Sequence, residues 1–206
     1  REQDSYFLSS PYFALSDKPM IDAARCSPTG TGRGTTGVIV IDDKKTLAAL
    51  SEHIYKMYED LEKALSNPVA RFFIKRQSGE KSLRVLRDFV MPQVHWYIRW
   101  YREGKSNEIL RDCPVLMLFH CPVFEPSGDE NCLLAAFHAV MMAETMDIGT
   151  CLNGLIPPVC NRSPDIRKLI GLPDDREVHA SITFGYPKYP FGRIVPRDLE
   201  EVRYLS

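Results

Sequence analysis

The stretch SGDENCLLAAFHAVMMAETMDIGTCLNG, Ser127–Gly154, decides the fold class, because its central part is apolar around nearly its whole circumference. A surface helix would carry a polar face, so this pattern predicts a central, buried helix. Ser127 and Glu130 have the spacing of a capping box at its start. Gly149 is a typical C-terminal stop, and the turn GTCLNG follows it.

Strands are predicted on both sides of this helix. Upstream, PVLMLFHCP, Pro114–Pro122, is a short continuous apolar run, as in a strand buried on both faces. His120 within it is expected to be a hydrogen-bonded core residue. Downstream, SPDIRKLIG predicts a short helix that begins after Ser163 and ends at Gly171. The alternating segment EVHASITF, Glu177–Phe184, then predicts a final strand.

The N-terminal half combines a strand with long helices. A β-branched run predicts a strand over Val38–Ile41, and Asp43 suits the N-cap of an amphipathic helix that ends near Asn67. A second helical pattern runs from Leu83 to Tyr101, where Pro92 is expected to kink or divide it. Long helices between three or four strands predict an α+β protein.

The 206 residues suffice for one large domain with a substantial core. We expect a single domain over residues 1–206, with an irregular N-terminal segment over 1–20 and a C-terminal extension over 186–206. The 26 basic and 27 acidic side chains nearly balance, so no global field favours nucleic acid or an anionic membrane as a partner. No apolar run approaches the ~20 residues that span a bilayer, which predicts a cytoplasmic protein.

Familiar catalytic and metal-binding motifs are missing from the sequence. The six cysteines form no C-x-x-C pair and the five histidines are scattered singly, so no metal site is expected. The sequence also has no G-x-S-x-G elbow, H-E-x-x-H pair or Walker loop. A large core with so little intrinsic chemistry favours an organic cofactor as the source of reactivity.

The segment GRGTTG, Gly32–Gly37, has the glycine spacing of a dinucleotide-binding fingerprint. That motif needs a strand before it and a helix after it, whereas here helix-like MIDAARCS precedes and VIVIDD, of strand character, follows. A Rossmann site is therefore disfavoured. A glycine-rich surface loop and the edge of another kind of cofactor site remain.

Four segments in order, CPVLMLFHCP, CLLAAFHAVMMAETMDIGTCLNG, SPDIRKLIGLPDD and ITFGYPKYPFGRIVPR, resemble the flavin-dependent nitroreductase family. The resemblance covers roughly Ile21 to Arg197 and is closest to the branch with a TCW-type turn and a closing GYPK...R..PR segment. It implies a three-layer α+β fold, with a mostly antiparallel sheet flanked by helices, and an intertwined homodimer with FMN in clefts at the subunit interface. The family passes electrons from NAD(P)H, or from another donor such as a protein, to nitroaromatic, quinone or related small acceptors.

The resemblance also implies cofactor-binding residues, with no catalytic side chain because the flavin carries the chemistry. The turn would place main-chain amides against the flavin, and a C-terminal arginine, with Arg197 favoured over Arg193, would bind the phosphate. Gly32 and Gly34 stand where the family usually has an Asn and a Gln, and no Arg-Arg-Ser-x-Arg stretch is found near the N-terminus. The implied cofactor-binding residues are Pro28, Thr29, Gly30, Gly32, Gly34, Cys151, Leu152, Asn153, Gly154, Arg193 and Arg197.

Because those departures remove polar groups from the expected flavin site, a second hypothesis stands beside the oxidoreductase. It is a degenerate, dimeric binding or scaffold protein of the same fold with little flavin redox activity.

Overall fold

The computed structural model of the chain describes residues 7–8, 17–30, 32–189 and 203. The predicted flavin-phosphate ligands Arg193 and Arg197 lie outside these residues. In chain order the elements are β1 (Phe7–Leu8), α1 (Asp17–Arg25), β2 (Gly37–Ile41), α2 (Lys44–Ser66), α3 (Pro68–Val85), a π-helical turn (Leu86–Val90), α4 (Met91–Arg102), β3 (Val115–Pro122), α5 (Gly128–Glu144), β4 (Gly149–Leu152), α6 (Pro157–Arg162), α7 (Pro164–Ile170) and β5 (Arg176–Pro187).

The sheet is antiparallel at every described pairing. The strand order is β1-β5-β3-β2, and β4 pairs with β5 beside β1. Strand β3 is buried along almost its whole length, as its continuous apolar run predicts. Strands β1 and β4 were not predicted, since both are too short to show an alternating pattern.

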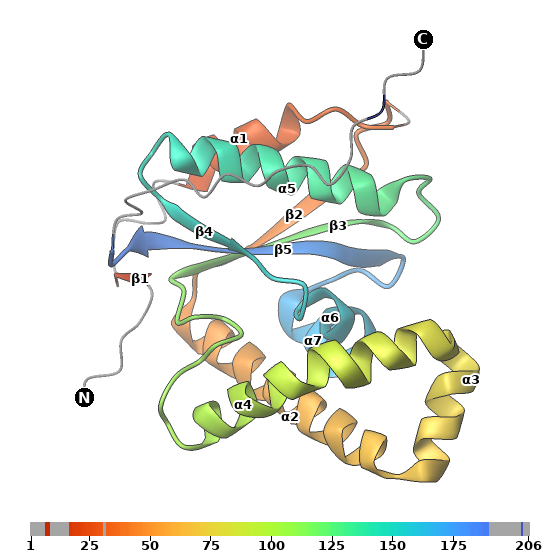
Figure 1. Ribbon diagram of the computed structural model, residues 1–206. Helices are drawn as coiled ribbons and strands as arrows, with labels where there is room; N and C mark the ends of the chain where they lie inside the picture. Colours follow the sequence, from red (N-terminus) through yellow and green to blue (C-terminus); the bar gives the residue numbers. More distant parts are fainter. Residues whose placement is uncertain (1–6, 9–16, 31, 190–202, 204–206) are drawn as a thin grey trace.

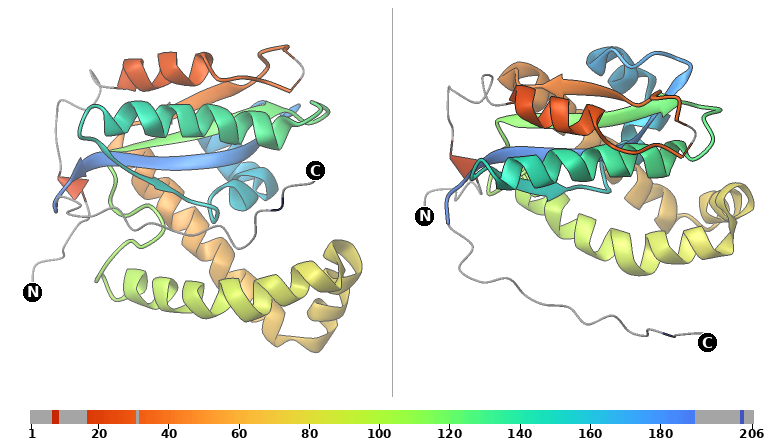
Figure 2. Two further views of the ribbon diagram at one scale, coloured as in Figure 1. Left: turned by 45° about the horizontal axis from the view of Figure 1, so that its top comes forward. Right: turned by 90° about the horizontal axis from the view of Figure 1, so that it is seen from above.

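Helices cover both faces of the sheet and make three layers (Figure 1). One face carries α1 and α5, and the other carries α2, α4, α6 and α7 (Figures 1 and 2). The predicted three-layer α+β fold with a mostly antiparallel sheet is confirmed. Because β2 runs antiparallel to β3 and follows α1, the parallel βαβ unit of a dinucleotide-binding fingerprint is not formed.

Helix α5 differs from the predicted central, buried helix. Its buried side faces the sheet and consists largely of alanines, which let the helix approach the strands closely. Its other side exposes large apolar side chains, with Leu133 and Phe137 exposed by 50% and 56%. The helix is apolar around its whole circumference, yet the described residues cover only one of its two sides.

The start of α5 is as predicted, but its capping box and its predicted end are wrong. Ser127 is the N-cap and its carbonyl accepts from the Asn131 amide at 2.9 Å, yet it adopts φ 55° and makes no side-chain capping bond. A Cβ at the next residue, Gly128, would clash with Cys121 Sγ. The helix ends at Glu144, and Gly149 instead begins β4. A Cβ at Gly149 would lie 3.2 Å from the carbonyl oxygen of Gly185 on the neighbouring strand, which explains the glycine as a close-approach residue.

The long helices between β2 and β3 are largely as predicted. Asp43 caps α2 by accepting a hydrogen bond from the Thr46 amide at 2.8 Å. The helical run is divided near Pro92, as expected, by a π-helical turn over Leu86–Val90 immediately before α4. Helix α3 was missed over its first part, and a break at Gly79, with φ 81° and ψ 162°, divides it.

The predicted helix after Ser163 is confirmed, with Ser163 Oγ accepting from the Ile166 amide and Gly171 in the left-handed conformation at its end. The expected irregular segment over residues 1–20 is not irregular throughout. Residues 7–8 form β1 on β5, and α1 begins at Asp17. At the other end, β5 continues to Pro187, two residues into the expected C-terminal extension.

Candidate functional site

The turn after β4 is held by the side chain of Asn153, which is only 8% exposed. Asn153 Nδ2 donates to the Ile109 carbonyl, and Asn153 Oδ1 accepts from the Leu155 amide at 2.9 Å. The Asn153 amide donates to the Ser181 carbonyl at 2.9 Å, and Ser181 Oγ donates back to the Asn153 carbonyl at 2.6 Å. Both the side chain and the main chain of Asn153 therefore serve to shape the turn, and its amide is not open to a ligand.

The main-chain amides of the residues on either side of Asn153 do not bond to β5. In an antiparallel ladder the main-chain groups of successive residues point to opposite sides of a strand. Because Asn153 bonds to β5, the amide of Leu152 points to the outer edge of β4, which no described strand covers. Among the described residues the Gly154 amide has no acceptor. Of the four predicted flavin-contacting residues, Leu152 and Gly154 thus present open donors, while Cys151 and Asn153 face β5.

The glycine-rich loop lies against the start of α5. The Gly30 amide donates to Asn131 Oδ1 at 2.8 Å, whereas the buried Asn131 Nδ2 has no hydrogen-bond partner among the described residues. Gly32 and Gly34 adopt φ values of 67° and 62°, which most side chains disfavour. Their backbone conformation therefore accounts for glycine at both positions.

Arg176 anchors the end of this loop to the sheet. Its Nη2 donates to the Thr35 carbonyl at 3.2 Å, and its Nη1 donates to His120 Nδ1 at 3.0 Å. Burial, and then the neighbouring Arg176 charge, lower the pKa of His120 to about 4. His120 is thus a neutral, hydrogen-bonded histidine, as expected, and its role is to fix the loop.

The two predicted groups of flavin-contacting residues do not meet within one chain. The loop containing Pro28, Thr29 and Gly30 leads into β2, whereas the turn follows β4, and the strands lie in the order β2, β3, β5, β4. Three strand spacings separate the two edges by ~14 Å. A single chain therefore presents the two predicted groups at opposite edges of its sheet.

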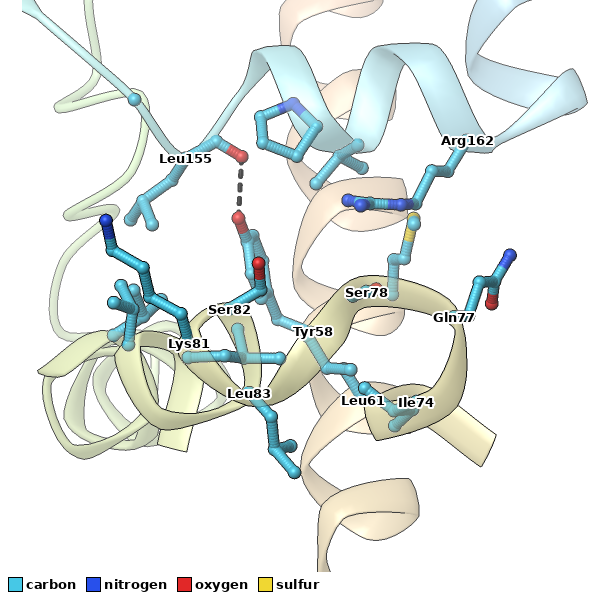
Figure 3. Close-up of a pocket in the computed structure, with 17 residues that line it drawn as sticks. Tyr58, Leu61, Ile74, Gln77, Ser78, Lys81, Ser82, Leu83, Leu155 and Arg162 are labelled. Atoms are coloured by element: carbon cyan, nitrogen blue, oxygen red, sulfur yellow. Dashed lines mark hydrogen bonds between the residues drawn. The ribbon is translucent and has the colours of Figure 1, made fainter. Parts of the chain in front are cut away.

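A cavity of about 700 Å³ opens beside the turn, where Gly154 and Leu155 meet the long helices (Figure 3). Such a volume lies within the usual range for small-molecule sites. Tyr58 lines it from α2, and its hydroxyl donates to the Leu155 carbonyl at 2.7 Å. Burial raises the pKa of Tyr58, which keeps this donor protonated.

Sequence reasoning missed this cavity, because its walls come from segments as far apart as Met57 and Arg162. The one local signal was Gly79, a helix breaker inside α3.

The six cysteines are free thiols, four of them buried. Burial raises the pKa of Cys160 to about 12 and raises that of Cys113 further, so these two are packing residues rather than nucleophiles. Within residues 17–30 and 32–189, no three metal-ligating side chains converge. None of the described helices is both long enough and apolar enough to cross a membrane.

The fold and the sites together define a three-layer α+β domain with a small-molecule cavity and an open strand edge. The chain belongs to the nitroreductase family, whose sequence profile matches residues 18–186. No curated protein sequence matches the chain significantly.

Solved structures share the fold at low sequence identity. A nitroreductase with bound FMN from Bacteroides fragilis NCTC 9343 has 15% identity and a TM-score of 0.62, over 100% of this chain and 93% of its own. A BluB-like flavoprotein from Clostridium difficile 630 has 14% identity and a TM-score of 0.68, over 100% and 95%. An iodotyrosine deiodinase bound to FMN and 3-iodo-L-tyrosine has 16% identity and a TM-score of 0.56, over 99% and 93%.

Proposed function

We propose that this protein is an FMN-dependent oxidoreductase that takes electrons from NAD(P)H or another donor and reduces nitroaromatic, quinone or related small acceptors. The observation that carries the proposal is the family match over residues 18–186. The open donors after β4, next to a ligand-sized cavity, support it. The fold neighbours that were solved with bound FMN support the choice of cofactor.

The residues of this chain suit a flavin in two ways. The Leu152 and Gly154 amides would donate to polar edge atoms of the ring, where a reduced flavin carries negative charge. At the opposite edge the Gly30 loop and the unpartnered Asn131 Nδ2 would contribute to a neighbouring site. Bound FMN would accept a hydride or electrons from the donor and pass them to the acceptor.

The two predicted groups at opposite sheet edges support a homodimer, in which the loop of one chain completes the turn of its partner. The exposed apolar stripe of α5 supports the same assembly. Its members recur at helical spacing along one side, and they would be covered by a second chain. The stripe consists of Leu133, Leu134, Phe137 and Met141.

The remaining predicted contacts complete this proposal. Pro28 and Thr29 would lie along the flavin beside Gly30. The next two glycines, Gly32 and Gly34, would contribute backbone groups only. Cys151 would support the turn through its strand pairing with Thr183. A C-terminal arginine, Arg197 or Arg193, would bind the phosphate.

Absorbance of the purified protein tests the cofactor. We expect flavin bands near one FMN per chain after incubation with FMN and removal of the excess. Gly154→Pro removes one proposed donor, whereas Gly154→Ala keeps it and meets no neighbouring atom within 4 Å. We expect about tenfold weaker FMN binding for Gly154→Pro and little change for Gly154→Ala.

A protein that stays colourless, and does not oxidise NADH or NADPH in the presence of a nitroaromatic or quinone, would contradict the proposal. It would favour the degenerate binding or scaffold protein, whose motivation is the glycine at positions 32 and 34.

A further inference from the structure

We propose that the cavity between α2, α3 and the turn after β4 binds an aromatic or quinone-like molecule that carries a carboxylate. This inference gives the acceptor class for the proposed oxidoreductase and rests on that function only for the ligand's role as an acceptor. The binding itself is argued from the cavity.

The body of the cavity is apolar. Its walls come from both long helices and from the turn, so a flat hydrophobic ligand would bury most of its surface there. These walls include Met57, Leu61, Ile74, Leu86, Leu155 and Val159.

The charged lining groups are all cationic. Lys81 comes from α3 and Arg162 from the end of α6, and no aspartate or glutamate is among the described lining residues. Figure 3 shows the two cations on either side of the Tyr58–Leu155 hydrogen bond. Neither has an ion-pair partner among the described residues, in contrast to Lys75, which pairs with Glu80 on the same helix. Two unpaired cations over an apolar floor favour an anionic group at the mouth of the cavity.

The polar part of the wall lies on either side of the break in α3. At Gly79 the chain leaves helical geometry, and the residues on both sides of the break line the cavity. Gln77 and Ser78 precede the break, while Lys81 and Ser82 follow it. The break thus lies between the two pairs of polar residues that line this wall. The positive φ at Gly79 disfavours any other residue.

Calorimetry with a matched pair of probes tests the inference. The two probes are 4′-nitrobiphenyl-4-carboxylate and the corresponding neutral 4′-nitrobiphenyl-4-methanol. We expect the carboxylate to bind at least about tenfold more tightly at low salt, and the preference to shrink as NaCl is added.

Variants that each lack one positive charge show which side chains cause the preference for the carboxylate. Lys81→Met and Arg162→Met should each weaken carboxylate binding by about five- to tenfold and change alcohol binding by less than about twofold. Lys56→Met removes the same charge from an exposed position on α2 outside the cavity and should leave both affinities unchanged. Circular dichroism of each variant checks that it is folded.

Equal affinity for the two probes would overturn the inference, as would an equal loss in Lys56→Met. It would also be overturned if Lys81→Met and Arg162→Met lost FMN absorbance instead of probe discrimination, since the cations would then serve the cofactor. Probe binding by colourless protein would sink the proposed oxidoreductase alone. A yellow, active protein that shows no carboxylate preference would sink the cavity inference alone.

Discussion

The two helical layers on the sheet place their large apolar side chains in opposite ways. In the layer of α2, α4, α6 and α7, bulky residues such as Leu50, Ile54 and Tyr55 are fully buried against the sheet. In the layer of α1 and α5, the helix contacts the sheet through alanines and points Leu133 and Phe137 outward.

The difference teaches which layer is complete within one chain. The layer that contains α2 buries its large apolar side chains in a core of its own and has a cavity beside it, so it needs no second chain to cover these side chains. The layer that contains α5 leaves an apolar stripe exposed, which a second copy would cover. Helix α3 also exposes apolar residues, including Phe72 at 61%, so exposure alone does not identify the interface.

The largest effect is expected at the α5 stripe. Phe137→Glu should weaken self-association by at least about 100-fold, because it buries a charge in the proposed interface. Phe72→Glu, at a similarly exposed site on α3, should leave the dimer intact. Light scattering after size exclusion measures both. A monomeric Phe72→Glu beside a dimeric Phe137→Glu would show that we have assigned the interface to the wrong helix.

A second test compares a buried side chain of α2 with an exposed side chain of α3. Ile54→Ala should lower the free energy of unfolding by about 2–5 kcal/mol, since it opens a hole in a fully buried cluster. Val69→Ala, at a residue that is 64% exposed on α3, should change it by less than ~0.5 kcal/mol. Urea unfolding at a fixed protein concentration measures both. Equal losses would mean that the outer surface of α3 is also covered in solution.

The smallest effect concerns the sheet between the layers. His120 has a pKa of about 4 in the folded chain and an ordinary pKa of 6.5. Between these two values the unfolded chain binds a proton at His120 that the folded chain does not bind. The contribution of His120 to the free energy of unfolding is therefore fully present above pH 6.5 and is lost as the pH falls toward about 4. Below pH 4 this contribution changes no further. Unfolding across this range should show a shallower pH dependence for His120→Gln. An unchanged slope would contradict the neutral histidine at Arg176.

The fold was largely predictable from particular segments. The apolar run Val115–Pro122 and the caps at Asp43 and Ser163 are local signals, and the structure bears them out. Helix α3 escaped prediction because its apolar residues do not gather on one face, and Phe72 and Phe73 remain exposed. The end of α5 was mispredicted because Gly149 is a close-approach residue of β4 rather than a helix stop, and the capping box at its start is not formed.

The candidate site was predictable only in part. The motif after β4 identified the turn, but only the β4–β5 register shows that Leu152 and Gly154 face outward while Asn153 shapes the turn. The sequence also could not show that the loop at Gly30 and the turn lie at opposite edges of the sheet within one chain, which the strand order decides. The cavity has no sequence signature, since its lining is assembled from distant segments.

By itself, the sequence determined the class of fold, the family and the order of most helices and strands, because these depend on local periodicity, capping and motif order. Only the tertiary structure decided which half of α5 is covered, which amides are open and which two unpaired cations line the same apolar cavity. Those properties depend on contacts between residues far apart in the chain, and no local pattern specifies such contacts.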